Sequence, residues 1–187
     1  MPNRLTHITT RGGDKGQSGL ADGSRHPKTD TTFAALGDID ELNCALGIVV
    51  THLEPNHPLR ETLIELQSRL FDLGGAIAMP GTAFDLSDEV TVLDEQIARY
   101  NARLGPLANF ILPGGTLAGA QMHLARAVSR RAERSVWALL KERSNDYDAS
   151  LGVFLNRLSD LFFVFARLLN VDSPEMLWQQ KRRAKTE

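Results

Sequence analysis

The sequence predicts an all-α protein, a five-helix up-and-down bundle with a glycine-rich loop at its N-terminus. Three observations favour this fold class. Apolar residues recur at steps of three and four in five segments, turn residues separate those segments, and β-like alternation is too short to be useful. The 187 residues, 42% of them hydrophobic, suffice for one core, so we expect a single domain over residues 1–187.

The first 27 residues are rich in Gly, Thr, Asp and basic side chains without an apolar period, which predicts loop with at most short strands. A first helix follows from about Thr29 to near Leu53, before the turn EPNHP. A second helix has the clearest stripe and stops at Pro80-Gly81; its apolar positions are Leu59, Leu63, Leu66, Leu70, Leu73 and Ile77.

A third helix starts at Ser87, where Asp88 and Glu89 suit the helix dipole, and Gly105-Pro106 closes its apolar pattern. A loop containing FILPGG at 110–115 leads to a fourth helix over roughly 116–142. The last helix runs from about 149 to 170. Residues 171–187 form a polar C-terminal tail, and we expect its end, QQKRRAKTE at 179–187, to be frayed.

Composition excludes several functional classes. A net charge of −2 and a pI near 6.2 give no general attraction to nucleic acid or to an anionic membrane, so anion binding must be local. The longest apolar run near the C-terminus, 161–166, is too short to span a bilayer, and the N-terminus lacks a secretory signal. The single cysteine, Cys44, is expected to pack as a small hydrophobe, and these features predict a cytoplasmic protein.

The segment TTRGGDKGQSGLADGSRHPK, residues 9–28, combines five glycines with Arg11, Lys15, Arg25 and Lys28. Glycines let the backbone turn tightly and present N–H groups to phosphate oxygens, while cationic side chains neutralise their charge. The string is not a Walker A loop, because no Gly-Lys-Ser/Thr ends it. It predicts a phosphate cradle of another design; a solvated N-terminal arm is the alternative.

Two further clusters lie on the last two predicted helices. Arg126, Arg130, Glu133 and Arg134 share one side of the fourth helix, with Arg131 nearby, and this excess of positive charge favours an anionic ligand over an ordinary solvated face. In the last helix Asn156, Asp160 and Arg167 form one stripe inside an apolar run, which indicates either a ligand site or a buried polar network. The histidines show no paired ligand spacing, so we expect no protein-bound transition metal.

Together these segments resemble the corrinoid (cob(I)alamin) adenosyltransferases of the propanediol-utilisation type. The resemblance covers RGGDKGQSGLADGSRHPK, GDIDELNCALG at 37–47, FILPGG with HLARAVSRRAER at 123–134, and LNRLSDLFFVFAR at 155–167. It implies a homotrimer of five-helix bundles that binds ATP with Mg²⁺ at subunit interfaces, next to cobalamin. The implied reaction is attack of Co(I) on the 5′ carbon of ATP, giving adenosylcobalamin and triphosphate.

The resemblance also implies roles for individual residues. Arg126 would pair with Asp40 to close the corrinoid pocket, and Phe110 would cover the lower face of the corrinoid and favour a four-coordinate Co(II) state. The nucleotide would be bound by Thr9, Thr10, Gly13, Lys15, Arg25, Lys28, Arg130, Glu133, Arg134 and Asn156. No protein nucleophile is needed, because the corrinoid supplies it.

The loop departs from the family pattern at Gly13, Gln17-Ser18 and His26-Pro27, so phosphate contacts from its backbone are expected more firmly than those from its side chains. Two other functions stay open: an ATP-responsive corrinoid carrier, and a helical protein whose arginine face docks an acidic partner. For the enzyme, a reductase and an adenosylcobalamin-dependent acceptor enzyme are the expected partners.

Overall fold

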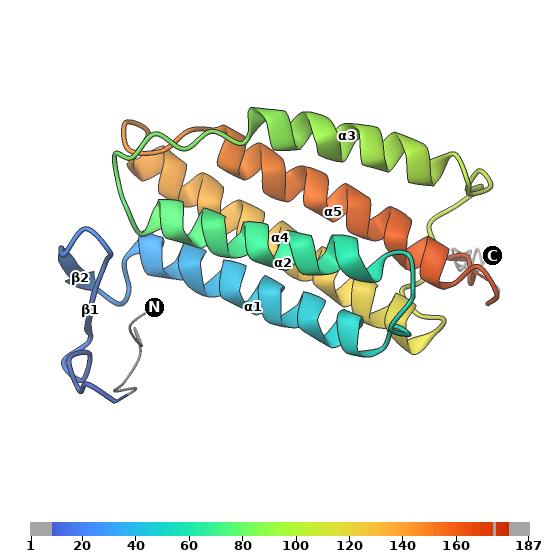
Figure 1. Ribbon diagram of the computed structural model, residues 1–187, viewed down its shortest axis with the longest axis horizontal. Coiled ribbons are helices and arrows are strands. Elements are labelled where there is room, and N and C mark those ends of the chain that lie inside the picture. Colours follow the sequence, from blue (N-terminus) through green and yellow to red (C-terminus); the bar gives the residue numbers. More distant parts are fainter. Residues whose placement is uncertain (1–8, 174, 180–187) are drawn as a thin grey trace, which may run out of the picture.

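The computed structural model describes residues 9–173 and 175–179, and the described chain forms five helices whose direction alternates (Figure 1). This arrangement confirms the predicted up-and-down bundle. The helices are α1 Thr31–Thr51, α2 Arg60–Ile77, α3 Ser87–Asn101, α4 Leu117–Glu142 and α5 Ser150–Leu169. None of the helices in the described ranges is long and apolar enough to cross a membrane.

The helix ends follow from local chemistry. At the start of α1 the Asp30 carboxylate accepts a hydrogen bond from the Thr32 backbone N–H, and at the start of α4 the Thr116 hydroxyl accepts one from Gly119. Helix α3 ends at Asn101, a few residues before Gly105-Pro106, because the chain continues as a turn in which the Leu104 N–H donates to the Asn101 carbonyl.

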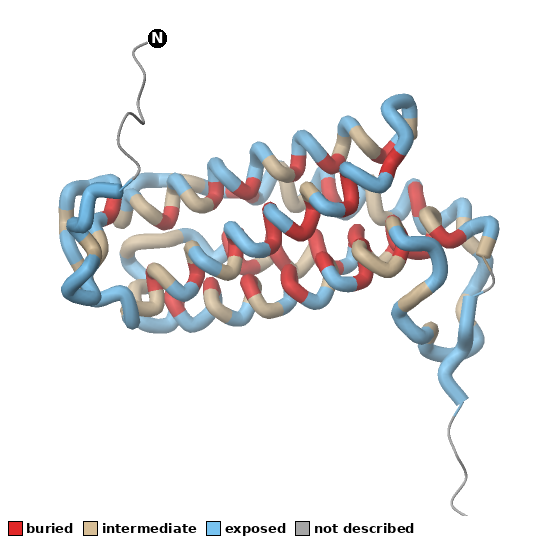
Figure 2. Tube along the Cα trace, turned by 90° about the horizontal axis from the view of Figure 1, so that it is seen from below, coloured by how far each residue is buried: buried red, intermediate tan, exposed pale blue. Residues whose placement is uncertain are grey.

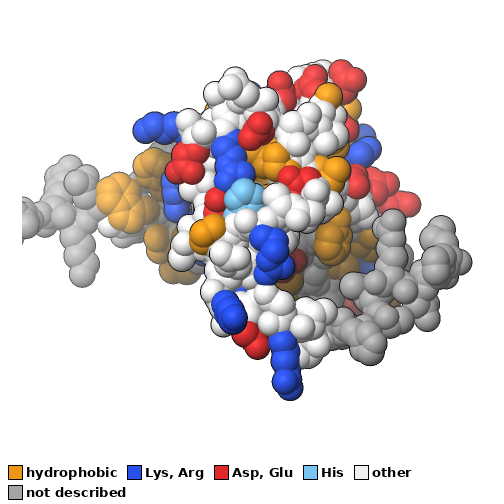
Figure 3. Space-filling model, turned by 90° about the vertical axis from the view of Figure 1, so that its left-hand side faces the viewer, with side chains coloured by type: hydrophobic (Ala, Val, Ile, Leu, Met, Phe, Trp, Pro, Cys, Tyr) orange, Lys and Arg blue, Asp and Glu red, His pale blue; other side chains and the backbone are white. Residues whose placement is uncertain are grey.

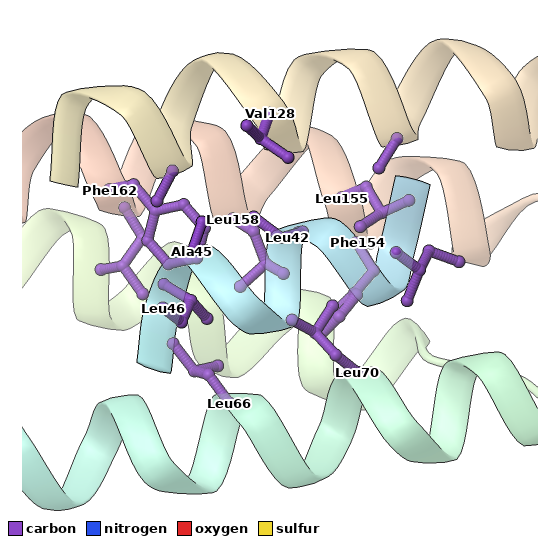
Figure 4. Close-up of a cluster of buried hydrophobic side chains, with 14 of the residues drawn as sticks. Leu42, Ala45, Leu46, Leu66, Leu70, Val128, Phe154, Leu155, Leu158 and Phe162 are labelled. Carbon is purple, nitrogen blue, oxygen red and sulfur yellow. The ribbon is translucent and has the colours of Figure 1, made fainter. Parts of the chain in front are cut away.

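The core is centred on α1, α4 and α5. Helix α1 packs on α2 and α4, and α5 packs on α4 and α3. Buried residues lie along the inward faces of the helices, while the loops are mostly exposed (Figure 2). Figure 4 shows how residues from different helices meet, with Leu42 of α1, Leu70 of α2, Val128 of α4 and Phe154 of α5 in one cluster. The apolar run in α5 is explained by this central position.

The glycine-rich segment contains the two short strands that the sequence allowed. β1 Gln17–Gly19 pairs antiparallel with β2 Arg25–Pro27, Ser18 lying opposite His26. The hairpin is joined to one end of the bundle, where the Ala21 N–H donates to the Ala78 carbonyl. Beside the hairpin, Arg143 at the end of α4 donates to Asp30, 2.7 Å away. The hairpin therefore lies beside the start of α1, at the end of the bundle where α2 and α4 end (Figure 1).

One expectation needs correction. Cys44 is exposed rather than packed, because it shares with Asp40 and Ile48 a stripe of α1 that faces away from the core.

The segment after α5 folds back onto the loop that precedes α4. Residues 175–178 pair with the loop before α4, since the Leu112 N–H donates to the Met176 carbonyl and the Trp178 N–H donates to the Phe110 carbonyl. Residues 180–187 lie outside the described residues.

A buried asparagine, Asn170, joins the end of α5 to the start of α4. The Asn170 side-chain oxygen accepts from the Thr116 N–H at 2.8 Å, and its amide donates to the Gly114 carbonyl at 2.8 Å. Close approach is needed here, because a Cβ at Gly119 would lie 2.1 Å from the Asn170 oxygen. Asn170 therefore connects the end of α5 to the start of α4.

Replacing Asn170 by alanine is expected to lower the free energy of unfolding by about 1–3 kcal/mol, because the partly buried backbone groups of Thr116 and Gly114 lose their hydrogen-bond partner. Chemical denaturation followed by circular dichroism measures this change. The matched control is Asn145→Ala at an exposed loop position. Equal stability of the two variants would show that Asn170 contributes nothing beyond space filling.

Candidate active site

The basic face of α4 divides into two kinds of arginine. Arg131 pairs with carboxylates of α1: its Nε lies 3.0 Å from Asp38, and a second nitrogen contacts Glu41. Ser135 donates to the same Asp38 carboxylate. The carboxylates of Asp38 and Glu41 neutralise the charge of Arg131, and the contacts join α4 to α1. Arg131 therefore has a structural role.

The other three arginines of the cluster are left without a carboxylate. Among the described residues, Arg126, Arg130 and Arg134 form no ion pair, although an Arg134 nitrogen donates to the Arg130 carbonyl at 3.1 Å. Because the three lie at spacings of four along α4, the guanidinium groups share one face of the helix. Like charges repel on such a face, so an anion placed there would be strongly stabilised.

Arg126 is the most enclosed of the three. Its Nε is buried and has no hydrogen-bond partner among the described residues. Burial, and then the neighbouring charge of Arg130, lower the pKa of Arg126 below its usual range. The residue lines two adjoining hollows. One, of about 320 Å³, lies between α3, α4 and α5 and also involves Arg130 and Asp160; the other, of about 530 Å³, extends to Phe110.

Glu133 and Asn156 meet across α4 and α5. The Asn156 amide donates to the Glu133 carboxylate at 3.3 Å. The Asn156 oxygen in turn accepts from Arg157 at 2.9 Å, and Arg157 pairs with Asp94 of α3 at 2.6 Å. The sequence placed Glu133 and Asn156 in one site, and the structure brings them together. The chain of contacts leaves them in a defined position beside the Arg130 face.

Arg167, predicted to share a stripe with Asn156, serves a different purpose. It is buried and donates to both oxygens of Glu175, at 2.7 and 3.4 Å, and to the Gly105 carbonyl at 2.9 Å. A bidentate pair of this kind is geometrically specific. It holds the C-terminal segment and the loop after α3 against the end of α5, away from Asn156.

Phe110 lies at the rim of the larger hollow with 78% of its surface exposed. Its backbone is held on both sides, because its N–H donates to the Asn109 side chain and its carbonyl accepts from Trp178. The wall of the hollow includes Phe163 of α5 and His123 and Arg126 of α4. An exposed aromatic ring on a fixed backbone is suited to contact a flat apolar ligand.

The glycine-rich loop gathers several of its predicted phosphate ligands. Arg25 donates to the Gly12 carbonyl at 2.7 Å, and a Cβ at Gly13 would lie 2.9 Å from the Lys28 ammonium nitrogen. Glycine at position 13 is therefore what lets Lys28 lie against the loop backbone. Thr9, Thr10 and Lys15 are exposed. At this end of the molecule, basic side chains alternate with acidic and polar ones (Figure 3).

The structure does not bring all the predicted residues into one place within the chain. The loop lies at the C-terminal end of α4, whereas Phe110 precedes its N-terminal end (Figure 1). The predicted pair between Asp40 and Arg126 is not formed within the described chain; Asp40 is exposed on α1, and Arg126 faces α5. A complete site would need groups from more than one copy of the chain.

Sequence reasoning missed His123. This residue is 3% exposed, and neither ring nitrogen has a hydrogen-bond partner in the described part of the chain. Burial, followed by the charge of Arg126, lowers the pKa of His123, and Glu175 opposes this effect. A spacing of three from Arg126 was the only signal in the sequence, and it does not distinguish a core histidine from a ligand.

Comparison with known proteins agrees with this geometry. A family model described as cobalamin adenosyltransferase matches residues 8–169. The chain is 44% identical over 187 residues to a cobalamin adenosyltransferase of Cupriavidus metallidurans, covering 98% of this chain and 100% of that protein. It is 38% identical to the corrinoid adenosyltransferase of Mycobacterium tuberculosis, with 96% of each chain covered.

Solved structures give the same result. A variant of the PduO-type ATP:corrinoid adenosyltransferase from Lactobacillus reuteri, complexed with cobalamin and ATP, superposes with a TM-score of 0.87 at 34% identity, covering 94% of this chain and 98% of the other. A second variant of that enzyme, complexed with ATP, has a TM-score of 0.86 at 35% identity, with coverage of 92% and 100%. The chain therefore belongs to the cobalamin adenosyltransferase family.

Proposed function

We propose that this protein transfers the 5′-deoxyadenosyl group of ATP to the cobalt of a corrinoid, giving adenosylcobalamin and triphosphate. The observation that carries the proposal is the α4 face on which Arg126, Arg130 and Arg134 form no ion pair within residues 9–173 and 175–179, next to a hollow rimmed by Phe110. Such a face suits a polyphosphate, and such a rim suits a flat macrocycle.

The bond changes balance without a protein nucleophile. The lone pair of Co(I) forms a bond to the 5′ carbon, the bond from that carbon to the triphosphate oxygen breaks, and its electron pair leaves with triphosphate while cobalt becomes Co(III). The protein must therefore position the two substrates, neutralise the leaving group and exclude water.

Each group of residues has a defined task in this proposal. Arg130 and Arg134 bind the phosphates from the α4 side, and Glu133 with Asn156 binds the adenosine portion. The loop surrounds the phosphates from the other side, through its backbone and through Thr9, Thr10, Gly13, Lys15, Arg25 and Lys28. Arg126 and Arg134 are eight residues apart, or roughly 12 Å along the helix axis, which leaves room for the 5′ carbon between cobalt and triphosphate.

Mg²⁺ is proposed to enter with the triphosphate. The described residues contain no group of three His, Cys, Asp or Glu side chains that are placed to hold a metal ion. Phosphate oxygens and waters are ligands that Mg²⁺ accepts readily. When bound there, it would reduce the charge of the leaving group, while the arginines of α4 orient it.

We infer that the site is assembled between chains of a homotrimer. Arg126 is half-buried and its Nε has no hydrogen-bond partner in the part of the chain that the structure describes, while Asp40 is exposed on the outer face of α1. A charge-assisted pair between Arg126 of one chain and Asp40 of the next would satisfy both groups. A cytoplasmic location, a reductase that supplies Co(I), and an acceptor enzyme for adenosylcobalamin complete the proposal.

The test of the reaction is an anaerobic assay with chemically reduced cob(I)alamin and MgATP. We expect the cob(I)alamin absorption to disappear while light-sensitive adenosylcobalamin and triphosphate form in equal amounts. ATP binding without product would overturn the transferase proposal and favour a carrier.

The interface is tested by complementation. Asp40→Ala and Arg126→Ala are each expected to impair turnover, and co-expression of the two is expected to restore part of it, because some interfaces in a mixed trimer combine the two intact residues. Mixed and single-variant preparations with the same low turnover would contradict an intersubunit pair. Sedimentation of each preparation verifies that the subunits still assemble.

A further inference from the structure

His123 is a buried polar side chain that the proposed mechanism leaves without a task. It lies one turn before Arg126 on α4, and its ring packs beside Phe163 of α5 with centroids 6.2 Å apart at 60°. Neither Nδ1 nor Nε2 has a partner among the described residues. Leaving a buried polar group unsatisfied costs about 1–3 kcal/mol, so an imidazole at this position is unfavourable for the fold alone.

The ring stands between two hollows. The larger one, about 530 Å³, has Phe110, Arg126 and Phe163 in its wall; the other, about 330 Å³, lies beneath the loop before α4 and reaches Glu175. His123 lines both. His123 therefore forms part of the wall that a ligand in the larger hollow would contact, next to Arg126.

The surroundings decide the charge of the ring. Arg126 from the same helix and Glu175 from the C-terminal segment are the charged groups that act on it, and burial together with Arg126 holds the pKa of His123 below its ordinary value. Near neutral pH the imidazole is uncharged, with one N–H donor and one nitrogen acceptor. This combination suits a carboxamide, which also donates and accepts, better than a phosphate, which only accepts.

We propose that His123 is a substrate-binding residue that hydrogen-bonds a peripheral carboxamide of the corrinoid. The inference rests on the proposed function, because the corrin ring carries such carboxamides and the proposal seats it against Phe110. The two orphaned nitrogens are then explained as groups that lack partners only until the corrinoid arrives. By holding the edge of the ring, His123 sets the position of cobalt relative to Arg126.

The test compares wild type with His123→Phe, which keeps a flat ring without polar atoms, and with His123→Gln, which keeps a donor and an acceptor. Lys141→Ala, exposed near the end of the same helix, is the control. For His123→Phe we expect the KM for cob(I)alamin to rise about tenfold, the effect of losing one hydrogen bond of about 1.4 kcal/mol. The KM for MgATP should stay unchanged, and His123→Gln should recover part of the corrinoid affinity.

A second readout separates binding from packing. Without ligand, His123→Phe should melt at the same or a higher temperature than wild type, because it removes unsatisfied polar atoms. An unchanged corrinoid KM in this variant would overturn the inference, as would equal increases in the KM for both substrates. If His123→Phe fails to fold, His123→Leu, which also lacks polar atoms, replaces it: a raised corrinoid KM with an unchanged MgATP KM supports the inference, and an unchanged corrinoid KM overturns it.

Modified substrates provide the sharpest test. Cobalamin derivatives in which a single peripheral carboxamide has been hydrolysed to a carboxylate should include one that wild type binds more weakly and that His123→Phe does not distinguish from cobalamin. Equal discrimination by both proteins would contradict a contact between His123 and any carboxamide. Absence of turnover in wild type would instead sink the proposed function, so the two failures are distinguishable.

Discussion

Arg126→Ala is expected to lower kcat/KM for corrinoid adenosylation by roughly 30- to 1000-fold. This range corresponds to about 2–4 kcal/mol of transition-state stabilisation, the effect of removing one preorganised electrostatic contact. Arg126 qualifies because it is half-buried, lacks a partner for Nε in the described chain, and lines both hollows of the site. Initial rates at varied cob(I)alamin and MgATP measure the change.

The control for this variant is Arg69→Ala, which removes an exposed arginine of α2 far from the α4 face. Arg126→Lys keeps the charge but loses the planar fork, and we expect it to recover only part of the activity. Near-normal turnover by Arg126→Ala would reject the role given to this residue.

Phe110→Ala is expected to keep its affinity for MgATP while losing the four-coordinate Co(II) state of the bound corrinoid. The exposed ring lies on a backbone held by Asn109 and Trp178, and it would exclude water and offer no ligand to a cobalt placed beside it. Alanine would open the lower face to water or to the nucleotide base of the corrinoid. Absorption and electron paramagnetic resonance spectra of cob(II)alamin with enzyme and MgATP measure the coordination number directly.

Leu112→Ala, in the same loop, is the matched control because it removes an apolar side chain outside the hollow of Phe110. It should retain the four-coordinate signal. A Phe110→Ala spectrum equal to that of wild type would leave Phe110 as a packing residue. Loss of the signal in both variants would assign the effect to the loop as a whole.

The sequence predicted the helices well because their signal is local. Steps of three and four define an apolar stripe, and Asp30, Thr116 and Pro80 mark boundaries through backbone chemistry that needs no neighbour. The five-helix fold is confirmed. The assignment of Glu133 and Asn156 to one site came from the family resemblance and stays a prediction, although the two side chains are in contact.

What the sequence did not reveal depends on which helix a stripe meets. Arg131 looks like its neighbours in the sequence, yet only the approach of α1 gives it Asp38. Cys44 belongs to an apolar stretch, but its stripe faces outward. Arg167 has the spacing of a site residue, but it forms an ion pair with Glu175, which lies after α5 in the sequence. Helical periodicity predicts in which direction a side chain points from the helix axis. It does not predict which neighbouring element the side chain contacts.

The pairing of Arg131 with α1 has a consequence for product release. It leaves Arg126, Arg130 and Arg134 beside two carboxylates of the described chain, Glu133 and Asp160, so the α4 face keeps an excess of positive charge. Triphosphate carries more negative charge when it departs than it did as part of ATP, so the same face holds the product more strongly than the substrate. We therefore expect triphosphate to compete with ATP and to dissociate slowly after the cobalt–carbon bond has formed.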